Sequence, residues 1–237
     1  MNNPGRWAII RRMPHRVGIL LSGSGLYDGS EVQEAVLTIL ALDRAGSRVE
    51  VIAPDRPQLD VVDHASSQVV EGDVRNVLSE SCRIARGRVT AADQARPEAL
   101  DALFLPGGYG AAKNWMSGFA TPGSPREPHP EIRALVGHFL ERRKPVGVVS
   151  LAEALIAAML GEPLGEETLS MPASEVRVDD RRNIVYTPGF LGGGRISDVA
   201  AGIDKMVAEV LARAGGIAGR PGAAEEAPAG LEEGDPR

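Results

Sequence analysis

Five short apolar runs are separated by longer segments in which apolar residues recur every three or four positions. The runs show little alternation between apolar and polar residues, which is typical of parallel strands covered on both faces. They are Val17–Leu21, Val49–Ala53, Ala102–Leu105, Val146–Val149 and Ile184–Tyr186. The segments with helical periodicity are the stretch from Ser30 to Gly46, Asn76–Arg86, Glu131–Arg142, Leu151–Leu160 and Val199–Ala212. This alternation predicts an α/β fold with a doubly wound, mostly parallel sheet flanked by helices, as in flavodoxin-like proteins.

The first helix carries the clearest local signals. Ser30 and Gln33 have the spacing of a capping box, and Gly46 is placed to end the helix. Its apolar positions predict a face that packs on the sheet. These positions are Val32, Ala35, Val36, Ile39, Leu40 and Leu42.

Length and composition fit one globular domain. The chain has 237 residues, of which 43% are hydrophobic and 24% charged, close to the average for a soluble protein. We expect an N-terminal extension over 1–15, the α/β domain over 16–214, and a disordered acidic tail over 215–237 that has little to bury. Met13 stands just before the first strand, so Met1 and Met13 both remain candidate start sites.

Charge and cysteine content narrow the class of partner. The net charge of −6 argues against a nucleic-acid-binding surface, and no apolar run is long enough to span a bilayer. The single cysteine, Cys82, cannot form an internal disulfide, and we expect it to be a buried structural thiol in a helix. With no secretory apolar region near the start, these features predict a cytoplasmic protein.

The junction VGVVSLAEAL is the first candidate for chemistry. An apolar strand passes directly into a helix, and Ser150 stands at the corner, as the nucleophile does in a nucleophile elbow. Serine at a helix start most often caps the helix, and the G-x-S-x-G consensus is absent, so these residues alone favour a cap.

Two glycine-rich loops follow other strands. In LPGGYG, Gly107 and Gly108 can turn backbone N–H groups toward an anion, although a tight turn also explains them. The loop SGSGLYDGSEVQE could cradle a phosphate with Asp55 as a ribose-binding acid, but its spacing departs from the dinucleotide fingerprint. Glu31 and Glu34 in its first helical turn are either partners of the helix dipole or buried acids that donate a hydrogen bond.

The histidines offer little further chemistry. They are His15, His64, His129 and His138, and none follows Ser150 in the sequence. No pair has metal-ligand spacing with a carboxylate or cysteine, so we expect no metal site.

Seven segments, taken in order, resemble one known family. They are GILLSGSGLYDGSEVQEAVLTILALDRAG, APDRPQLDVVDH, RNVLSESCRIARG, DALFLPGGYGAAKN, KPVGVVS, TPGF and AGIDKMV. Together they span roughly residues 16 to 213 and resemble the ThiJ/PfpI superfamily, which has a class I glutamine amidotransferase-like fold. Within it they are most similar to the ElbB-type glyoxalases, also called isoprenoid biosynthesis proteins with an amidotransferase-like domain.

The resemblance implies a set of site residues and a reaction. Ser150 aligns with the family's nucleophilic cysteine, and the pattern G-x-E-x-x-E makes Glu34 the acid bonded to it, with Glu31 beside it. Gly107 and Gly108 correspond to the oxyanion donors, and Ser24 and Leu151 complete the expected substrate-binding residues. The implied reaction is conversion of glyoxal, a small carbonyl compound, to glycolate with no cofactor, in a homodimer.

The sequence departs from this family pattern in ways that leave the function open. Ser150 replaces the cysteine, Ser24 stands where relatives can carry a cysteine, and the stretch from Leu164 to Val176 is short. A serine hydroxyl needs a general base that a partly ionised thiol does not. The hypotheses are therefore an impaired or altered glyoxalase and a catalytically silent binding or regulatory protein, for which Lys113 and Asn114 would supply ligand contacts. A serine hydrolase or glutamine amidotransferase lacks the required histidine.

Overall fold

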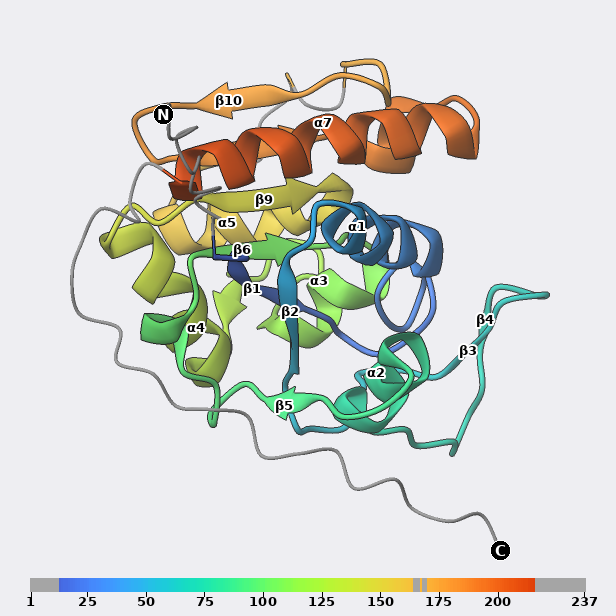
Figure 1. The fold of residues 1–237 in the computed structure, drawn as a ribbon. Helices are drawn as coiled ribbons and strands as arrows, with labels where there is room; N and C mark the ends of the chain where they lie inside the picture. The colour runs from blue at the N-terminus through green and yellow to red at the C-terminus, as the bar shows by residue number, and fades with distance from the viewer. Residues whose placement is uncertain (1–12, 164–166, 168–169, 216–237) are drawn as a thin grey trace, which may run out of the picture.

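The computed structural model describes residues 13–163, 167 and 170–215. Its central sheet has seven strands in the order β10-β11-β9-β6-β1-β2-β5 (Figure 1). All are parallel except β10, which pairs antiparallel with β11 at the sheet edge. The strands are β1 Arg16–Leu20, β2 Arg48–Ala53, β5 Thr90–Ala91, β6 Ala102–Leu105, β9 Val146–Val149, β10 Arg177–Asp179 and β11 Ile184–Thr187. The predicted α/β fold class is confirmed.

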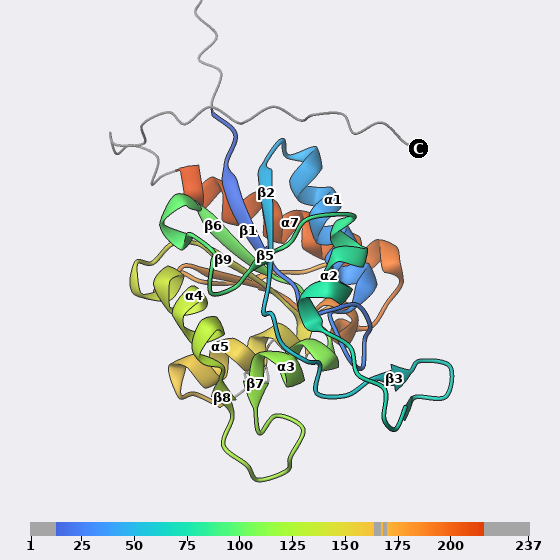
Figure 2. The ribbon, with the colours of Figure 1, turned by 90° about the horizontal axis from the view of Figure 1, so that it is seen from below.

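Helices cover both faces of the sheet (Figures 1 and 2). One apolar cluster joins α1 and α7 to one face, with α2 beside α1, and a second joins α3, α4 and α5 to the other. The α-helices are α1 Val32–Arg44, α2 Val77–Ala85, α3 Tyr109–Trp115, α4 Pro130–Glu141, α5 Glu153–Leu160 and α7 Ile196–Gly215. Short 3-10 helices are η1 Pro97–Ala99, η2 Ser150–Ala152 and η3 Gly189–Gly192.

Two small hairpins lie outside the sheet. β3 (Val62–Asp63) pairs with β4 (Gln68–Val69), and β7 (Met116–Ser117) pairs with β8 (Glu127–Pro128). The first projects away from the body of the domain in both ribbon views. The second follows α3 and leads into α4.

The predicted capping box of Ser30 and Gln33 is wrong. The N-cap is Glu31, whose carboxylate accepts the Glu34 N–H at 2.6 Å. The Ser30 hydroxyl accepts the Ser22 N–H at 2.8 Å instead, because Ser30 is drawn into the loop that follows β1.

Three of the six side chains of α1 that were predicted to pack on the sheet are exposed instead. Val32, Val36 and Leu40 are 39%, 47% and 38% exposed, whereas Ala35 and Leu42 are buried. The helix turns Glu34 inward, so its buried face carries Glu34, Thr38 and Leu42 with two alanines, and Val32, Val36 and Leu40 face outward.

Three further elements differ from the sequence-based expectations. The helix predicted over Leu151–Leu160 is a 3-10 turn followed by α5. Helix α3 was not predicted, because its first turn lies inside the glycine-rich stretch after β6. Cys82 lies in α2 as expected but is only half-buried.

Residues 1–12 and 216–237 lie outside the described residues, so the extension over 1–15, the start site and the tail over 215–237 stay predictions.

Candidate active site

Ser150 occupies a sharp corner between β9 and η2 and does not cap the helix. The N-cap is Val149, and no side-chain cap hydrogen bond is made there. Ser150 itself has φ of +55° and is 7% exposed. A left-handed conformation costs a non-glycine residue roughly 1–2 kcal/mol, which a simple cap does not require. The geometry is that of a nucleophile elbow.

Two main-chain donors from segments that follow different strands hold the Glu34 carboxyl. Its Oε2 accepts the Gly107 N–H at 3.1 Å, and its Oε1 accepts the Phe190 N–H at 3.0 Å. The Ser150 side chain lies beside the same carboxyl and lowers the pKa of Glu34 slightly. Because β6, β9 and β11 are neighbours in the sheet, their carboxyl ends bring these three groups together around a side chain that is 1% exposed.

The Glu34 enclosure, formed by Gly107, Ser150 and the loop Gly189–Phe190 around the Glu34 carboxyl, requires glycine at two positions. A Cβ at Gly107 would lie 2.6 Å from Glu34 Oε2 and 2.7 Å from the Ser150 Cβ. A Cβ at Gly189, where φ is +55°, would overlap Glu34 Oε1. The backbone therefore approaches the carboxyl more closely than any side chain would allow.

The pKa of Glu34 is raised from 4.5 to about 8, chiefly by burial and in smaller part by the nearby charge of Glu31. The hydrogen bonds from the Phe190 and Gly107 N–H groups, and the Ser150 side chain, act in the opposite direction and limit this rise in pKa. At neutral pH the acid form dominates, and it can donate a hydrogen bond to the Ser150 oxygen. About one molecule in ten carries the carboxylate at pH 7, which is enough for it to serve as a base.

The other expected site residues lie around this pair in different ways. Glu31 caps α1, and its backbone N–H donates to the Gly107 carbonyl at 2.8 Å, so it positions the loop after β6. Gly108 has φ of +121° and packs against the backbone of Glu31. Ser24 forms an isolated parallel bridge with Ser30.

Two expected ligand contacts are structural instead. Asn114 is buried, and its amide joins the Ser22 and Asp28 carbonyls and the Leu59 N–H. Lys113 is ion-paired with Asp60 at 2.6 Å. Leu151 directly follows Ser150 and is half-buried.

Sequence reasoning missed the role of the segment after β11. The Phe190 N–H contacts Glu34 across 156 positions of the chain. The signals for it were the Pro-Gly pair at Pro188–Gly189, which follows an apolar strand, and the segment TPGF in the family resemblance.

Metal and membrane features can be judged only for the part of the chain that the structure describes. There, no three His, Cys, Asp or Glu side chains gather as metal ligands would. Likewise, none of the helices described is long and apolar enough to cross a membrane.

Comparison with known proteins identifies the family. No family model matches the chain. The human "Glutamine amidotransferase-like class 1 domain-containing protein 3, mitochondrial" is 34% identical over 227 residues, covering 85% of this chain and 84% of that protein. The rat "ES1 protein homolog, mitochondrial" is 34% identical over 221 residues, covering 83% of each.

A solved structure agrees with these relatives. An isoprenoid biosynthesis protein with an amidotransferase-like domain from Ehrlichia chaffeensis superposes with a TM-score of 0.76 at 32% identity. The match covers 83% of this chain and 99% of that one. The chain therefore belongs to the glutamine amidotransferase-like class 1 domain proteins.

Proposed function

We propose that this protein is a slow glyoxalase of the ElbB type, which converts glyoxal to glycolate with Ser150 as nucleophile and Glu34 as its base. The observation that carries the proposal is the position of Ser150 beside the buried carboxyl of Glu34, whose pKa is raised to about 8. A base is most effective when its pKa lies near the working pH. An ordinary carboxylate would be a poor base for a serine hydroxyl, and burial removes that difficulty.

The reaction needs no external oxidant or reductant. The Ser150 oxygen bonds to one aldehyde carbon while its proton passes through Glu34 to the former carbonyl oxygen, giving a hemiacetal. The hydrogen on that carbon leaves as a proton and returns to the second carbon through an enediol, which leaves a glycolyl ester on Ser150. Water hydrolyses the ester to glycolate and restores the hydroxyl. One carbon is oxidised and its neighbour reduced, so the electrons balance.

The pH dependence follows from the raised pKa of Glu34. The ionised form is the base, so turnover should rise with pH and level off above about 8. A thiol at the same corner would be partly ionised near neutral pH and would not depend on Glu34 in this way. We therefore expect Ser150→Cys to be faster than the wild type below that pH.

A silent binding protein is the second candidate, and two observations favour it. Ser150 is only 7% exposed, so a substrate has little access to its oxygen. The Gly107 N–H already donates to Glu34 and is not left to bind an oxyanion.

The deciding experiment measures glycolate formation from glyoxal by purified wild type, Ser150→Cys, Ser150→Ala and Glu34→Gln. Ser66→Ala, on the projecting hairpin, is the control for a serine away from the site. Wild-type turnover that is lost in both Ser150→Ala and Glu34→Gln supports the enzyme. Inert wild type and Ser150→Ala, with activity gained only by Ser150→Cys, would replace the proposal with the silent binding protein.

Assembly and location remain proposals as well. We propose a homodimer, to be checked by sedimentation velocity, and a cytoplasmic location, although the names of both relatives place those proteins in mitochondria.

A further inference from the structure

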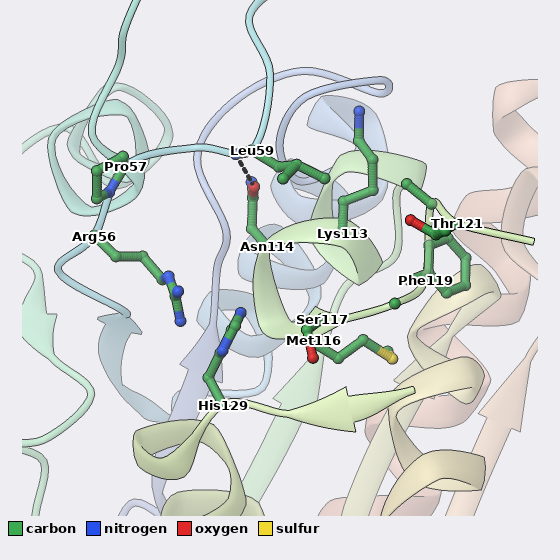
Figure 3. A pocket seen from close by; sticks show the side chains of 12 residues that line it. Arg56, Pro57, Leu59, Lys113, Asn114, Met116, Ser117, Phe119, Thr121 and His129 are labelled. Carbon is green, nitrogen blue, oxygen red and sulfur yellow. Dashed lines mark hydrogen bonds between the residues drawn. The ribbon is translucent and has the colours of Figure 1, made fainter. Parts of the chain in front are cut away.

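A cavity separate from the surroundings of Glu34 lies beside α3 (Figure 3). Its volume is about 200 Å³, and its walls come from the loop after β2, from α3, from the hairpin β7–β8 and from the start of α4. Neither Ser150 nor Glu34 lines it. The cavity lies beyond the carboxyl ends of β2 and β6, at the edge where open α/β sheets bind ligands.

The walls of this cavity contain no acidic side chain, although the whole chain has a net charge of −6. They carry nitrogen groups from Arg56, Lys113 and His129 and hydroxyls from Ser117 and Thr121. Lys113 is already paired with Asp60. The charge available to a ligand is therefore mainly that of the Arg56 guanidinium.

Arg56 has unused donors. Among the described residues its guanidinium makes one hydrogen bond, through Nη1 to Glu131 Oε1 at 3.3 Å, at the long end of the range. A guanidinium carries five N–H groups in a fixed planar fork that matches a carboxylate. Both partners are only partly buried, with side chains 33% and 24% exposed, so an anion in the cavity can compete with Glu131.

His129 places a second polar group on the same wall. Its imidazole lies close enough to Arg56 that this positive charge, after burial, lowers the pKa of His129, and the ring is neutral at pH 7. His129 is also the N-cap of α4, where it makes no side-chain cap hydrogen bond. The positive end of a twelve-residue helix therefore begins at the cavity wall.

The opposite side of the cavity is apolar. Leu59, Met116 and Phe119 face the space across from Arg56 and His129 (Figure 3). A ligand with a charged end and a short hydrocarbon body satisfies both sides. We propose that this cavity binds a small monocarboxylate, with its carboxylate on Arg56 and His129 and its carbon chain against Leu59, Met116 and Phe119.

The test is isothermal titration calorimetry at constant ionic strength with sodium propionate as the probe, and with propionamide and inorganic phosphate as comparisons. We expect saturable millimolar binding of propionate, since a ligand of about five heavy atoms seldom binds more tightly. Loss of the charged hydrogen bonds in Arg56→Gln should weaken binding roughly tenfold or more. Glu131→Gln removes the competing carboxylate and should tighten it.

Two controls separate this site from the rest of the protein. Arg83→Gln also removes an arginine paired with a glutamate, at 3.0 Å, and should leave propionate binding unchanged, as should Ser150→Ala. Opposite effects of Arg56→Gln and Glu131→Gln in variants with wild-type circular dichroism support the proposal. No saturable binding, equal binding by Arg56→Gln, or phosphate or propionamide binding as tightly as propionate would overturn it, whatever the result of the glyoxal assay.

Discussion

The enclosure of Glu34 predicts a specific dependence of stability on pH. The folded carboxyl has a pKa of about 8 and the unfolded one about 4.5, so between these values the unfolded chain releases a proton that the folded chain keeps. Stability contributed by this group is present below pH 4.5 and falls as the pH rises. Each unit of pKa difference corresponds to about 1.4 kcal/mol.

Between pH 5 and pH 8 this difference lowers the free energy of unfolding by roughly 3–4 kcal/mol. Glu34→Gln cannot ionise, so the variant should lack this part of the loss. At pH 5 it should be less stable than wild type by roughly 1–3 kcal/mol, because its amide NH₂ meets either the Gly107 or the Phe190 N–H, donor against donor. The free energies of unfolding of wild type and Glu34→Gln, plotted against pH, should therefore converge or cross as the pH rises.

Urea unfolding followed by circular dichroism at several pH values measures both curves. Other ionisable groups affect wild type and variant equally, so the informative quantity is the difference between them. Glu141→Gln, at a side chain that is 77% exposed, controls for the loss of one carboxylate. If Glu34→Gln loses as much stability as wild type between pH 5 and pH 8, the carboxyl is ionised in the folded state and the reasoning fails.

Three further substitutions test other parts of the structure. Asn114→Ala should cost roughly 2–4 kcal/mol in urea unfolding because it leaves several buried backbone groups unpaired, and a cost below about 0.5 kcal/mol would contradict this. Gly189→Ala should destabilise more than Gly161→Ala, since both have positive φ but only the first would overlap Glu34; equal unfolding free energies would refute the contact. Val36→Glu should change stability by less than about 0.5 kcal/mol because the side chain is exposed, and a change in sedimentation coefficient would place this face of α1 between two copies.

The sequence predicted the sheet better than the helix ends. Ala102–Leu105 and Val146–Val149 were predicted with their observed bounds, because an interior parallel strand must be apolar on both faces. The N-cap of α1 was missed because Ser30 and Glu31 can both accept an N–H, and the loop after β1 decides between them.

The candidate site was only partly predictable. The corner at Ser150 has no consensus of its own, and the local residues favoured a cap until the family resemblance aligned Ser150 with the family's nucleophilic cysteine. Periodicity could not show that α1 turns Glu34 inward in place of Val36. The Phe190 N–H reaches Glu34 only because β11 lies beside β9, an order of strands that no local pattern specifies.

The close approach of Gly107 and Phe190 to Glu34 has a consequence for substitution at position 150. The two hydrogen bonds that hold the acid come from main-chain N–H groups, which substitution of neighbouring side chains does not delete, whereas Ser150 contributes only its side chain. A cysteine at position 150 would therefore leave the main-chain partners of the Glu34 carboxyl in place.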